Sequence, residues 1–165
     1  AGEVGHTTIN ISGRRCACGN EGCLEAYASG PAIAARAREG LELGAESVLH
    51  ALVENELERV TAATVYEAVL VGDQYATGVM TETAKFLGAG IANAINMLNP
   101  EVVVIMGGVT QAGEHLFVPL KAEVRRRAFR AMADACRILP AELPNTSGVV
   151  GAAGIAAAEL GMLSG

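Results

Sequence analysis

Three cysteines and one histidine near the start of the chain have the types and the spacing of a metal site. Cys16, Cys18 and Cys23 lie within eight residues of one another, and His6 precedes the first of them by ten. Thiolate sulfur and imidazole nitrogen are donors that suit tetrahedral zinc, and three cysteines with one histidine are a common closed, structural set. The spacing therefore predicts a structural zinc site, with Glu25 immediately beside it.

Two other interpretations of these cysteines stay open on spacing alone: they are reduced bystanders, or two of them form a disulfide. A secreted disulfide scaffold would be short and rich in cysteine, whereas this chain has 165 residues and 4 cysteines and shows no charged and apolar leader. We therefore expect a reducing, cytoplasmic setting. Cys136 is remote from the other three, and we expect it to be a small buried hydrophobic residue.

Composition predicts one soluble domain. A chain of 165 residues with 51% hydrophobic content can form one core, and because it has no Trp that core must use smaller apolar side chains. The net charge of −6 disfavours nonspecific binding to nucleic acid. No apolar run approaches the roughly 18 residues of a membrane span.

Around the metal loop the pattern predicts short elements. Residues 4–11 are rich in β-branched side chains, which favour extended structure, and residues 24–28 are typical of a short helix. A second helix is expected to begin at Pro31 and to stop at Gly40. Residues 41–63 are acidic and of mixed pattern, as in a variable, partly helical segment.

The middle of the chain is more regular. Thr64 and Glu67 match a capping box at the start of a short helix. The strongest periodicity, over residues 73–98, predicts a long and mostly buried helix capped by Asp73. The glycines within it each cost about 1 kcal/mol relative to alanine, and a close neighbouring helix or backbone is the natural compensation. These glycines are Gly78, Gly88 and Gly90.

The last third of the chain has the order strand, glycine turn, helix. Residues 101–106 predict a buried parallel strand, and residues 114–133 predict an amphipathic helix with a solvated basic face. A further strand is expected over residues 137–139, and a small-residue helix that packs tightly over residues 151–161. This order indicates an α/β fold, and we expect one domain, residues 1–165.

Two sets of residues could bind small ligands. Gly107 and Gly108 follow the predicted strand, where open α/β sheets bind nucleotides, although turn glycines with a purely structural role are commoner. Glu3, His6 and Glu25 could together hydrogen-bond several hydroxyl groups, as in a sugar site. The alternative for the two glutamates is that one lies at a frayed terminus and the other only begins a helix.

Four segments of the chain carry a resemblance to a known family. They are Glu3-Val4-Gly5-His6, Cys16-Ala17-Cys18-Gly19-Asn20-Glu21-Gly22-Cys23-Leu24-Glu25, Ile91-Ala92-Asn93-Ala94-Ile95-Asn96 and Val104-Ile105-Met106-Gly107-Gly108. Together they closely resemble the ROK family of bacterial sugar kinases and sugar-responsive repressors. The resemblance covers essentially the whole chain, and residues 26–30 are most similar to the glucokinase branch.

The resemblance implies an actin-like, ribonuclease-H-like α/β fold, in which this chain is the carboxy-terminal lobe with its zinc-binding loop over residues 6–25. It implies structural zinc on His6 and the three cysteines, with sugar hydroxyls on Glu3, His6 and Glu25. Gly107 and Gly108 would line the ATP site. The implied reaction is transfer of the γ-phosphoryl group of ATP, with magnesium, to the 6-hydroxyl of glucose or a related hexose. A homo-oligomer is also implied.

The chain departs from the family pattern in one respect. Kinases of this family have an amino-terminal lobe with a phosphate-binding and magnesium-binding motif and an aspartate that accepts the proton of the sugar hydroxyl. Neither is found here, since Asp73 and Asp134 are both assigned to helix ends. We expect the chain alone to be inactive, because phosphoryl transfer depends on those groups.

Two alternatives remain beside the kinase. The chain could be the sugar-sensing domain of a ROK repressor, whose DNA-binding part would lie elsewhere. It could also be a folded scaffold in which zinc is only a structural clamp. The sequence leaves open the preferred hexose and the oligomeric state.

Overall fold

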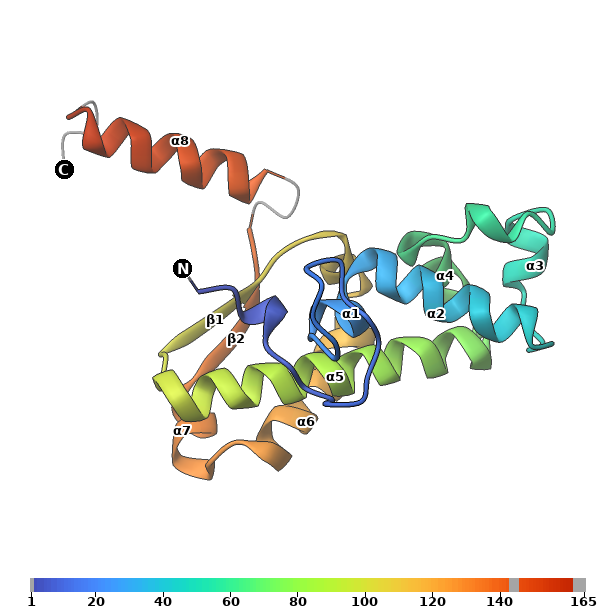
Figure 1. The fold of residues 1–165 in the computed structure, drawn as a ribbon, viewed down its shortest axis with the longest axis horizontal. Helices are drawn as coiled ribbons and strands as arrows, with labels where there is room; N and C mark the ends of the chain where they lie inside the picture. The colour runs from blue at the N-terminus through green and yellow to red at the C-terminus, as the bar shows by residue number, and fades with distance from the viewer. Residues whose placement is uncertain (1, 143–145, 162–165) are drawn as a thin grey trace.

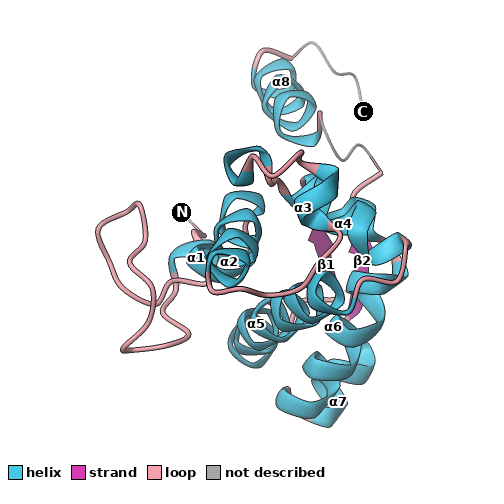
Figure 2. Cartoon of the chain, turned by 90° about the vertical axis from the view of Figure 1, so that its right-hand side faces the viewer, coloured by secondary structure: helices cyan, strands magenta, loops and turns pink. Residues whose placement is uncertain are grey.

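The computed structural model of the protein describes residues 2–142 and 146–161, in which helices surround a small parallel sheet (Figures 1 and 2). The α-helices are α1 (Glu25–Ala28), α2 (Gly30–Glu42), α3 (Leu49–Leu52), α4 (Ala62–Leu70), α5 (Gln74–Leu98), α6 (Glu114–Arg127), α7 (Arg130–Ala135) and α8 (Ser147–Glu159). The 3-10 helices are η1 (Val4–His6), η2 (Leu57–Arg59) and η3 (Gly108–Ala112), and the strands are β1 (Val102–Ile105) and β2 (Arg137–Pro140).

Helix α5 is the long buried helix that the periodicity predicts, and the other elements pack around it (Figure 1). Asp73 caps it as expected: its carboxylate accepts a hydrogen bond of 2.7 Å from the backbone N–H of Ala76 and another of 2.7 Å from Val48. The carboxylate thereby ties the start of α5 to the segment before α3. The core along α5 includes the fully enclosed side chains Ile33, Leu49, Val65, Ile95, Leu116 and Leu120.

Two of the three glycines in α5 lie where neighbouring elements come close, as predicted. A Cβ atom on Gly88 would lie 2.8 Å from Cβ of Glu123 in α6, and one on Gly90 would lie 2.4 Å from a methyl group of Leu24. Gly78 faces open space instead, so its cost to the helix has no such compensation. The close approach of α5 to α6 and to the start of α1 therefore depends on the absence of side chains at Gly88 and Gly90.

The predicted strands pair in parallel, with Val102 opposite Arg137 and Ile105 opposite Pro140. The expectation that the first strand is fully buried is wrong: Ile105 is buried, but Val104 is 58% exposed. In the described residues the sheet has these two strands alone, and only one of its faces is covered by helices. Alternate residues of β1 therefore point away from the core.

Several element boundaries near the start differ from the sequence prediction. Residues 4–11 form η1 and irregular loop, with one isolated bridge between Thr8 and Cys23, because they wrap around the cysteines and pair with no continuous strand. Helix α2 continues past Gly40 to Glu42. A Cβ atom at Gly40 would lie 2.0 Å from the hydroxyl of Tyr75, so this glycine permits a close contact and ends nothing.

The capping box is present one turn earlier than predicted. Thr61 caps α4, and Thr64 is its partner: the Thr61 hydroxyl accepts from the N–H of Thr64 at 3.2 Å, and the Thr64 hydroxyl accepts from the N–H of Thr61 at 2.9 Å. Glu67 lies within the helix. A threonine hydroxyl replaces the expected carboxylate because it reaches the same backbone donor.

The helix predicted over residues 114–133 is divided into α6 and α7. Between them the N–H of Phe129 donates to the side-chain oxygen of Asn96 at 2.9 Å, which anchors the break to the end of α5. The basic face of α6 is solvated, as expected. Cys136 is only partly buried, contrary to expectation, because it lies at the edge of the sheet beside the surface of α6.

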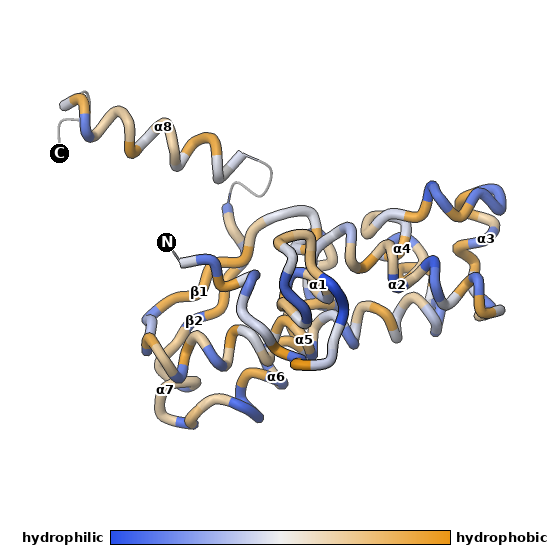
Figure 3. The backbone as a smooth tube through the Cα atoms, viewed as in Figure 1, coloured by the Kyte–Doolittle hydropathy of each residue, from blue (hydrophilic) through white to orange (hydrophobic). Residues whose placement is uncertain are grey.

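Helix α8 confirms the predicted small-residue helix but not its tight packing. Its described residues are mostly exposed, including Val149, Ile155 and Leu160, and it stands apart from the other helices (Figures 1 and 3). No atom lies within 4 Å of a Cβ built on Gly154. No helix in the described part of the chain is both long and apolar enough to cross a membrane.

Substitution of the α5 glycines tests this packing. Gly88→Ala is expected to lower the free energy of unfolding by about 1 kcal/mol, because overpacking against Glu123 outweighs the gain in helix propensity. Gly78→Ala is the matched control in the same helix and is expected to raise it by about 1 kcal/mol. Urea unfolding measures both, and a stabilised Gly88→Ala variant would contradict the close approach of α6.

The pKa of Glu123 gives a second test. Hydrogen bonds from Arg126 and Arg127 lower the pKa of this carboxyl group to about 2 from an ordinary value of 4.5. A lowered pKa means that the ionised form stabilises the fold above pH 4.5, and that this contribution is lost as the pH falls toward 2. Glu123→Gln is expected to cost about 1 kcal/mol at pH 7 and nothing near pH 2, by urea unfolding at several pH values.

Asp134→Asn is the control for this experiment. Asp134 lies 3.8 Å from Arg130 on the exposed surface of α7, so its loss is expected to change stability by less than about 0.5 kcal/mol. An equal effect of the two substitutions at pH 7 would show that Glu123 gains nothing from its two arginine partners.

Candidate metal centre and ligand cleft

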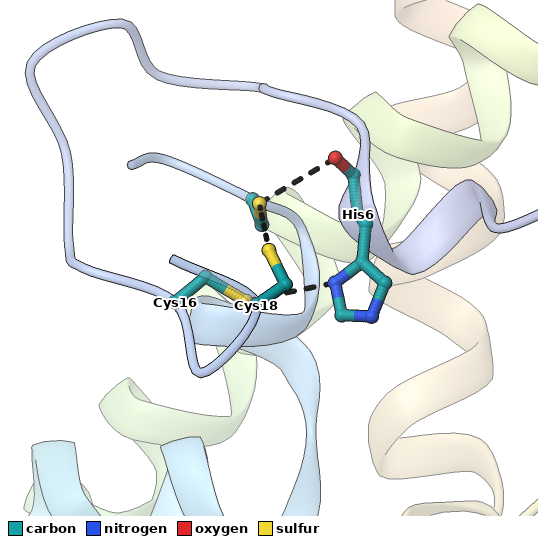
Figure 4. A group of neighbouring side chains, drawn as sticks. His6, Cys16 and Cys18 are labelled. Atoms are coloured by element: carbon teal, nitrogen blue, oxygen red, sulfur yellow. Dashed lines mark hydrogen bonds between the residues drawn. The ribbon is translucent and has the colours of Figure 1, made fainter. Parts of the chain in front are cut away.

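The structure brings the four predicted metal ligands together. One donor atom from each of His6, Cys16, Cys18 and Cys23 can be chosen so that all four lie within 4.8 Å of one another. His6 comes from η1, and the cysteines come from the loop that leads into α1 (Figure 4). Cys16 and Cys23 are buried and Cys18 is exposed.

The distances within this cluster fit zinc and exclude a disulfide. Sγ of Cys18 lies 3.7 Å from Sγ of Cys23, and Sγ of Cys16 lies 3.6 Å from Nδ1 of His6. A disulfide requires a separation of about 2.05 Å. Four donors at about 2.0 to 2.3 Å from a tetrahedral ion lie about 3.4 to 3.8 Å apart, which is the spacing found here.

The loop supplies further polar groups around the sulfurs. The side-chain amide of Asn20 donates to Sγ of Cys23 at 3.3 Å and to the hydroxyl of Thr8 at 3.0 Å. A backbone hydrogen bond from Asn20 lowers the pKa of Cys18, whereas burial raises the pKa of Cys23 to about 11. A thiol as buried as Cys23 ionises readily only beside a cation, as a ligating cysteine does.

His6 also connects the cluster to one of the predicted sugar ligands. Its Nδ1 faces the sulfurs, and its Nε2 lies 4.0 Å from a carboxylate oxygen of Glu25. A carboxylate near the second nitrogen of a ligating histidine orients the ring and fixes its tautomer. Glu25 is at the start of α1 and its side chain is 46% exposed, so its second oxygen is free to meet a ligand.

Glu3, the third predicted sugar ligand, is less closely placed. It precedes η1 and is exposed, and within the described residues its side chain has no hydrogen bond or ion pair. The structure therefore unites His6 with Glu25 but leaves Glu3 at the edge of the group. Its predicted role is not tested by these contacts.

Gly107 and Gly108 lie at a separate cleft of about 430 Å³ at the carboxyl end of β1. The remainder of the cleft is formed by the start of α2, the start of α4 and the segment that follows the glycines; its lining includes Ala28, Ser29, Gly30, Ala62, Ala63 and Gln111. Gly107 has a φ of +99°, a conformation that favours glycine. Both helix starts present backbone N–H groups, which favour an anionic ligand.

Sequence reasoning missed several residues that shape these sites. Asn20 was assigned only to a turn, and its contact with a sulfur could not be foreseen from spacing. Ala62 and Ala63 are far from the glycine pair in sequence and join it only through the packing of α4. Tyr27, two residues after Glu25, lies under the metal loop and accepts a hydrogen bond from the backbone of Arg14 at 2.7 Å.

Comparison with known proteins matches the description "ROK family" over residues 1–159. The chain is 42% identical to a glucokinase from Halalkalibacterium halodurans over 92% of its own length and 46% of the relative. It is 33% identical to the DNA-binding transcriptional dual regulator NagC of Escherichia coli, over 90% of this chain and 35% of the regulator. The chain thus spans less than half of either relative.

Among solved structures, the chain is similar to a ROK family glucokinase from Streptomyces griseus in complex with glucose and AMPPNP. The TM-score is 0.83 at 30% identity, and the match covers 93% of this chain and 50% of the other. This likeness supports the α/β fold of the ROK sugar kinases that the sequence implied. It also shows that the described helices and the two strands have the arrangement of a known kinase part.

Removal of one ligand tests the metal centre. The wild-type chain is expected to bind one zinc ion, and Cys23→Ser is expected to lower the affinity for zinc at least tenfold, because a buried thiolate ligand is lost. Cys136→Ser, which changes a cysteine outside the cluster, is the control and should bind zinc like the wild type. Competition with a chromogenic chelator measures all three, and unchanged affinity in Cys23→Ser would refute the ligand set.

Proposed function

This chain belongs to the ROK family, and we propose that it forms the carboxy-terminal part of an ATP-dependent sugar kinase of the glucokinase type. The proposed reaction is transfer of the γ-phosphoryl group of ATP to the 6-hydroxyl of glucose or a related hexose. Its main support is the layout of the candidate sites, together with the identity of 42% to a glucokinase. The chain spans 46% of that relative, so the activity belongs to the longer protein.

The observation that carries this proposal is the position of the two sites at opposite ends of α1. Glu25, beside His6 and the metal cluster, begins this helix, and Ala28 at its end lines the cleft of Gly107 and Gly108. A helix of four residues is about 6 Å long. A sugar at one end and a nucleotide at the other would therefore be close enough for direct phosphoryl transfer.

At the sugar end, we assign hydroxyl binding to Glu3, His6 and Glu25. The carboxylates accept hydrogen bonds from hydroxyl groups, and such bonds to charged acceptors are stronger than those between neutral groups. The metal cluster holds His6 through Nδ1, which leaves its Nε2 on the side of Glu25. Zinc, when bound, supplies a rigid anchor for the loop and takes no part in the transfer.

At the nucleotide end, the cleft offers backbone groups and little side-chain charge. Gly107 and Gly108 leave room for a ligand to approach the backbone, since no atom lies within 4 Å of a Cβ built on either. The starts of α2 and α4 add N–H donors that Ser29 and Thr61 already cap in part. We assign this cleft to the nucleotide, with magnesium supplied alongside ATP in the longer protein.

The base that accepts the sugar proton has no candidate among the aspartates of this chain. Asp73 is engaged as the cap of α5, and Asp134 lies beside Arg130 on the surface of α7. We assign the base, and the groups that bind magnesium, to the part of the protein that this chain does not span. The chain alone is accordingly expected to be inactive.

A second candidate function is the sugar-sensing domain of a ROK repressor. The identity of 33% to NagC over 90% of this chain supports it, because that regulator shares the same part of the fold. A sensor would need the sugar site and the metal loop but no nucleotide cleft. Nucleotide binding at Gly107 and Gly108 therefore separates the two candidates, whereas a homo-oligomer, also proposed, fits both.

Complementation tests the kinase proposal. We expect no phosphorylation of glucose by this chain alone and measurable phosphorylation when it is mixed with a separately produced amino-terminal half of a ROK glucokinase. A coupled assay for glucose 6-phosphate detects either result. Activity of the chain alone would contradict the assignment of the base, and a mixture that forms a complex but stays inactive would favour the sensor.

Substitution of Glu25 tests the sugar site. Glu25→Gln in the metal-loaded protein is expected to weaken glucose binding about tenfold or more, because a charged hydrogen-bond acceptor is lost. Glu21→Gln, an exposed position in the same loop, should leave the affinity unchanged. Isothermal titration calorimetry measures both, and equal affinities in the two variants would remove Glu25 from the site.

A further inference from the structure

The hydroxyl of Tyr27 lies under the metal loop, at a point where the loop meets the helical body. The ring is 5% exposed and packs against Phe86 of α5, with 4.3 Å between the ring centroids. Arg36 lies over the other part of this cluster, with its guanidinium carbon 5.8 Å from the centre of the Phe86 ring. Two helices therefore fix the direction in which the Tyr27 hydroxyl points.

That hydroxyl accepts two hydrogen bonds from the loop. The backbone N–H of Arg14 donates to it at 2.7 Å, and the side-chain amide of Asn10 donates at 3.3 Å. The loop lies so close that a Cβ atom on Gly13 would be 2.1 Å from the Tyr27 oxygen. The chain can pass over this hydroxyl only because residue 13 has no side chain.

The residues held by Tyr27 are connected to both cysteine-bearing arms of the loop. The carbonyl oxygen of Arg14, two residues before Cys16, accepts from the N–H of Gly22 at 2.7 Å, and Gly22 is the residue before Cys23. The carbonyl oxygen of Gly22 in turn accepts from the N–H of Asn10 at 3.3 Å. One hydroxyl, two loop residues and one glycine thus form a single network behind the sulfurs.

We propose that Tyr27 is a positioning residue for the metal centre: its hydroxyl fixes the backbone at Asn10 and Arg14, and through Gly22 it sets the separation of the Cys16 and Cys23 arms. This inference rests on the proposed metal site. A loop with preset arms loses less conformational entropy when it binds an ion, so release of the ion is slower. Tyr27 acts through the backbone and does not touch the ligand atoms.

A second contact holds the same segment from outside. The guanidinium of Arg14 forms a two-pronged ion pair with Glu39 of α2, one prong of which measures 2.8 Å, and this pair lowers the pKa of Glu39. It constrains the side chain of Arg14 at the surface, where an ion pair contributes little. The buried hydroxyl of Tyr27 constrains the peptide itself, so the two contacts have separable effects.

Removal of the hydroxyl tests the role, and the chain offers a matched control. Tyr27→Phe keeps the packing on Phe86 and deletes only the acceptor. Tyr75→Phe deletes a hydroxyl that donates to the backbone carbonyls of Arg36 and Ala37 at 3.2 and 2.8 Å, away from the loop. Both variants lose one hydrogen-bonded tyrosine hydroxyl, so a general loss of stability would affect them alike.

The measurements are zinc release into excess chelator and the visible absorption of the cobalt-substituted chain. Tyr27→Phe is expected to release zinc at least tenfold faster than Tyr75→Phe, which is the size of effect that supporting groups behind metal ligands produce. Its cobalt bands are expected to shift, because the angles between the thiolates change. Thermal unfolding of both variants at the same zinc occupancy controls for stability.

Gly13→Ala supplies an independent variant, since it adds a methyl group 2.1 Å from the Tyr27 oxygen. It is expected to speed zinc release in the wild-type background and to have a smaller effect in the Tyr27→Phe background, where that oxygen is absent. Such non-additivity is the signature of two groups in direct contact. Asn10, whose carbonyl oxygen would lie 2.9 Å from the added methyl, accounts for the part that remains.

The outcomes separate this inference from the proposal on which it rests. Zinc bound by the wild type, with the same release rate and cobalt spectrum in Tyr27→Phe and Tyr75→Phe, would overturn the role of Tyr27 alone. A wild-type chain that takes up no zinc would overturn the metal site and this role with it. Faster release confined to Tyr27→Phe and Gly13→Ala would support the inference.

Discussion

Helix α1 has only four residues, and its position depends on two contacts with α5: the ring of Tyr27 on Phe86 and the side chain of Leu24 against Gly90. A helix this short cannot persist by itself, because one turn makes too few hydrogen bonds to offset the entropy of ordering it. The surface of α5 therefore holds α1 in place. Both candidate ligand sites begin from this helix, so both inherit its dependence on α5.

The metal loop has no core of its own. Ile11, the largest apolar side chain near its tip, is 89% exposed, and the buried atoms of the loop are mainly sulfur and backbone. Its order comes from hydrogen bonds across the loop, from the hydroxyl of Tyr27 and from the convergence of His6 with the cysteines. A structural metal suits such a segment, because coordination supplies the free energy that apolar burial does not.

The two sites differ in the kind of group that they offer. The sugar end has carboxylate and imidazole side chains, which can be aimed at individual hydroxyls. The nucleotide end has backbone N–H groups at helix starts and a glycine pair, which suit an extended anionic ligand. Because α1 joins the ends within one turn, a shift of this helix would move both sites together, which ties the metal loop to the geometry of the whole proposed reaction.

The sequence by itself determined the metal ligand set, the long helix α5 with its cap at Asp73, and the parallel strands on either side of the glycine turn. These features depend on residue types at short spacing, where chemistry or periodicity is sufficient. It failed at Gly40, Thr64 and the segment 4–11, where a local pattern was overruled by contacts with distant residues. Only the tertiary structure decided that Gly40 meets Tyr75, that α4 completes the cleft of Gly107 and Gly108, and that Tyr27 supports the metal loop. The physical reason is that each of these depends on the distance between groups remote in sequence, which packing sets and which no local spacing contains.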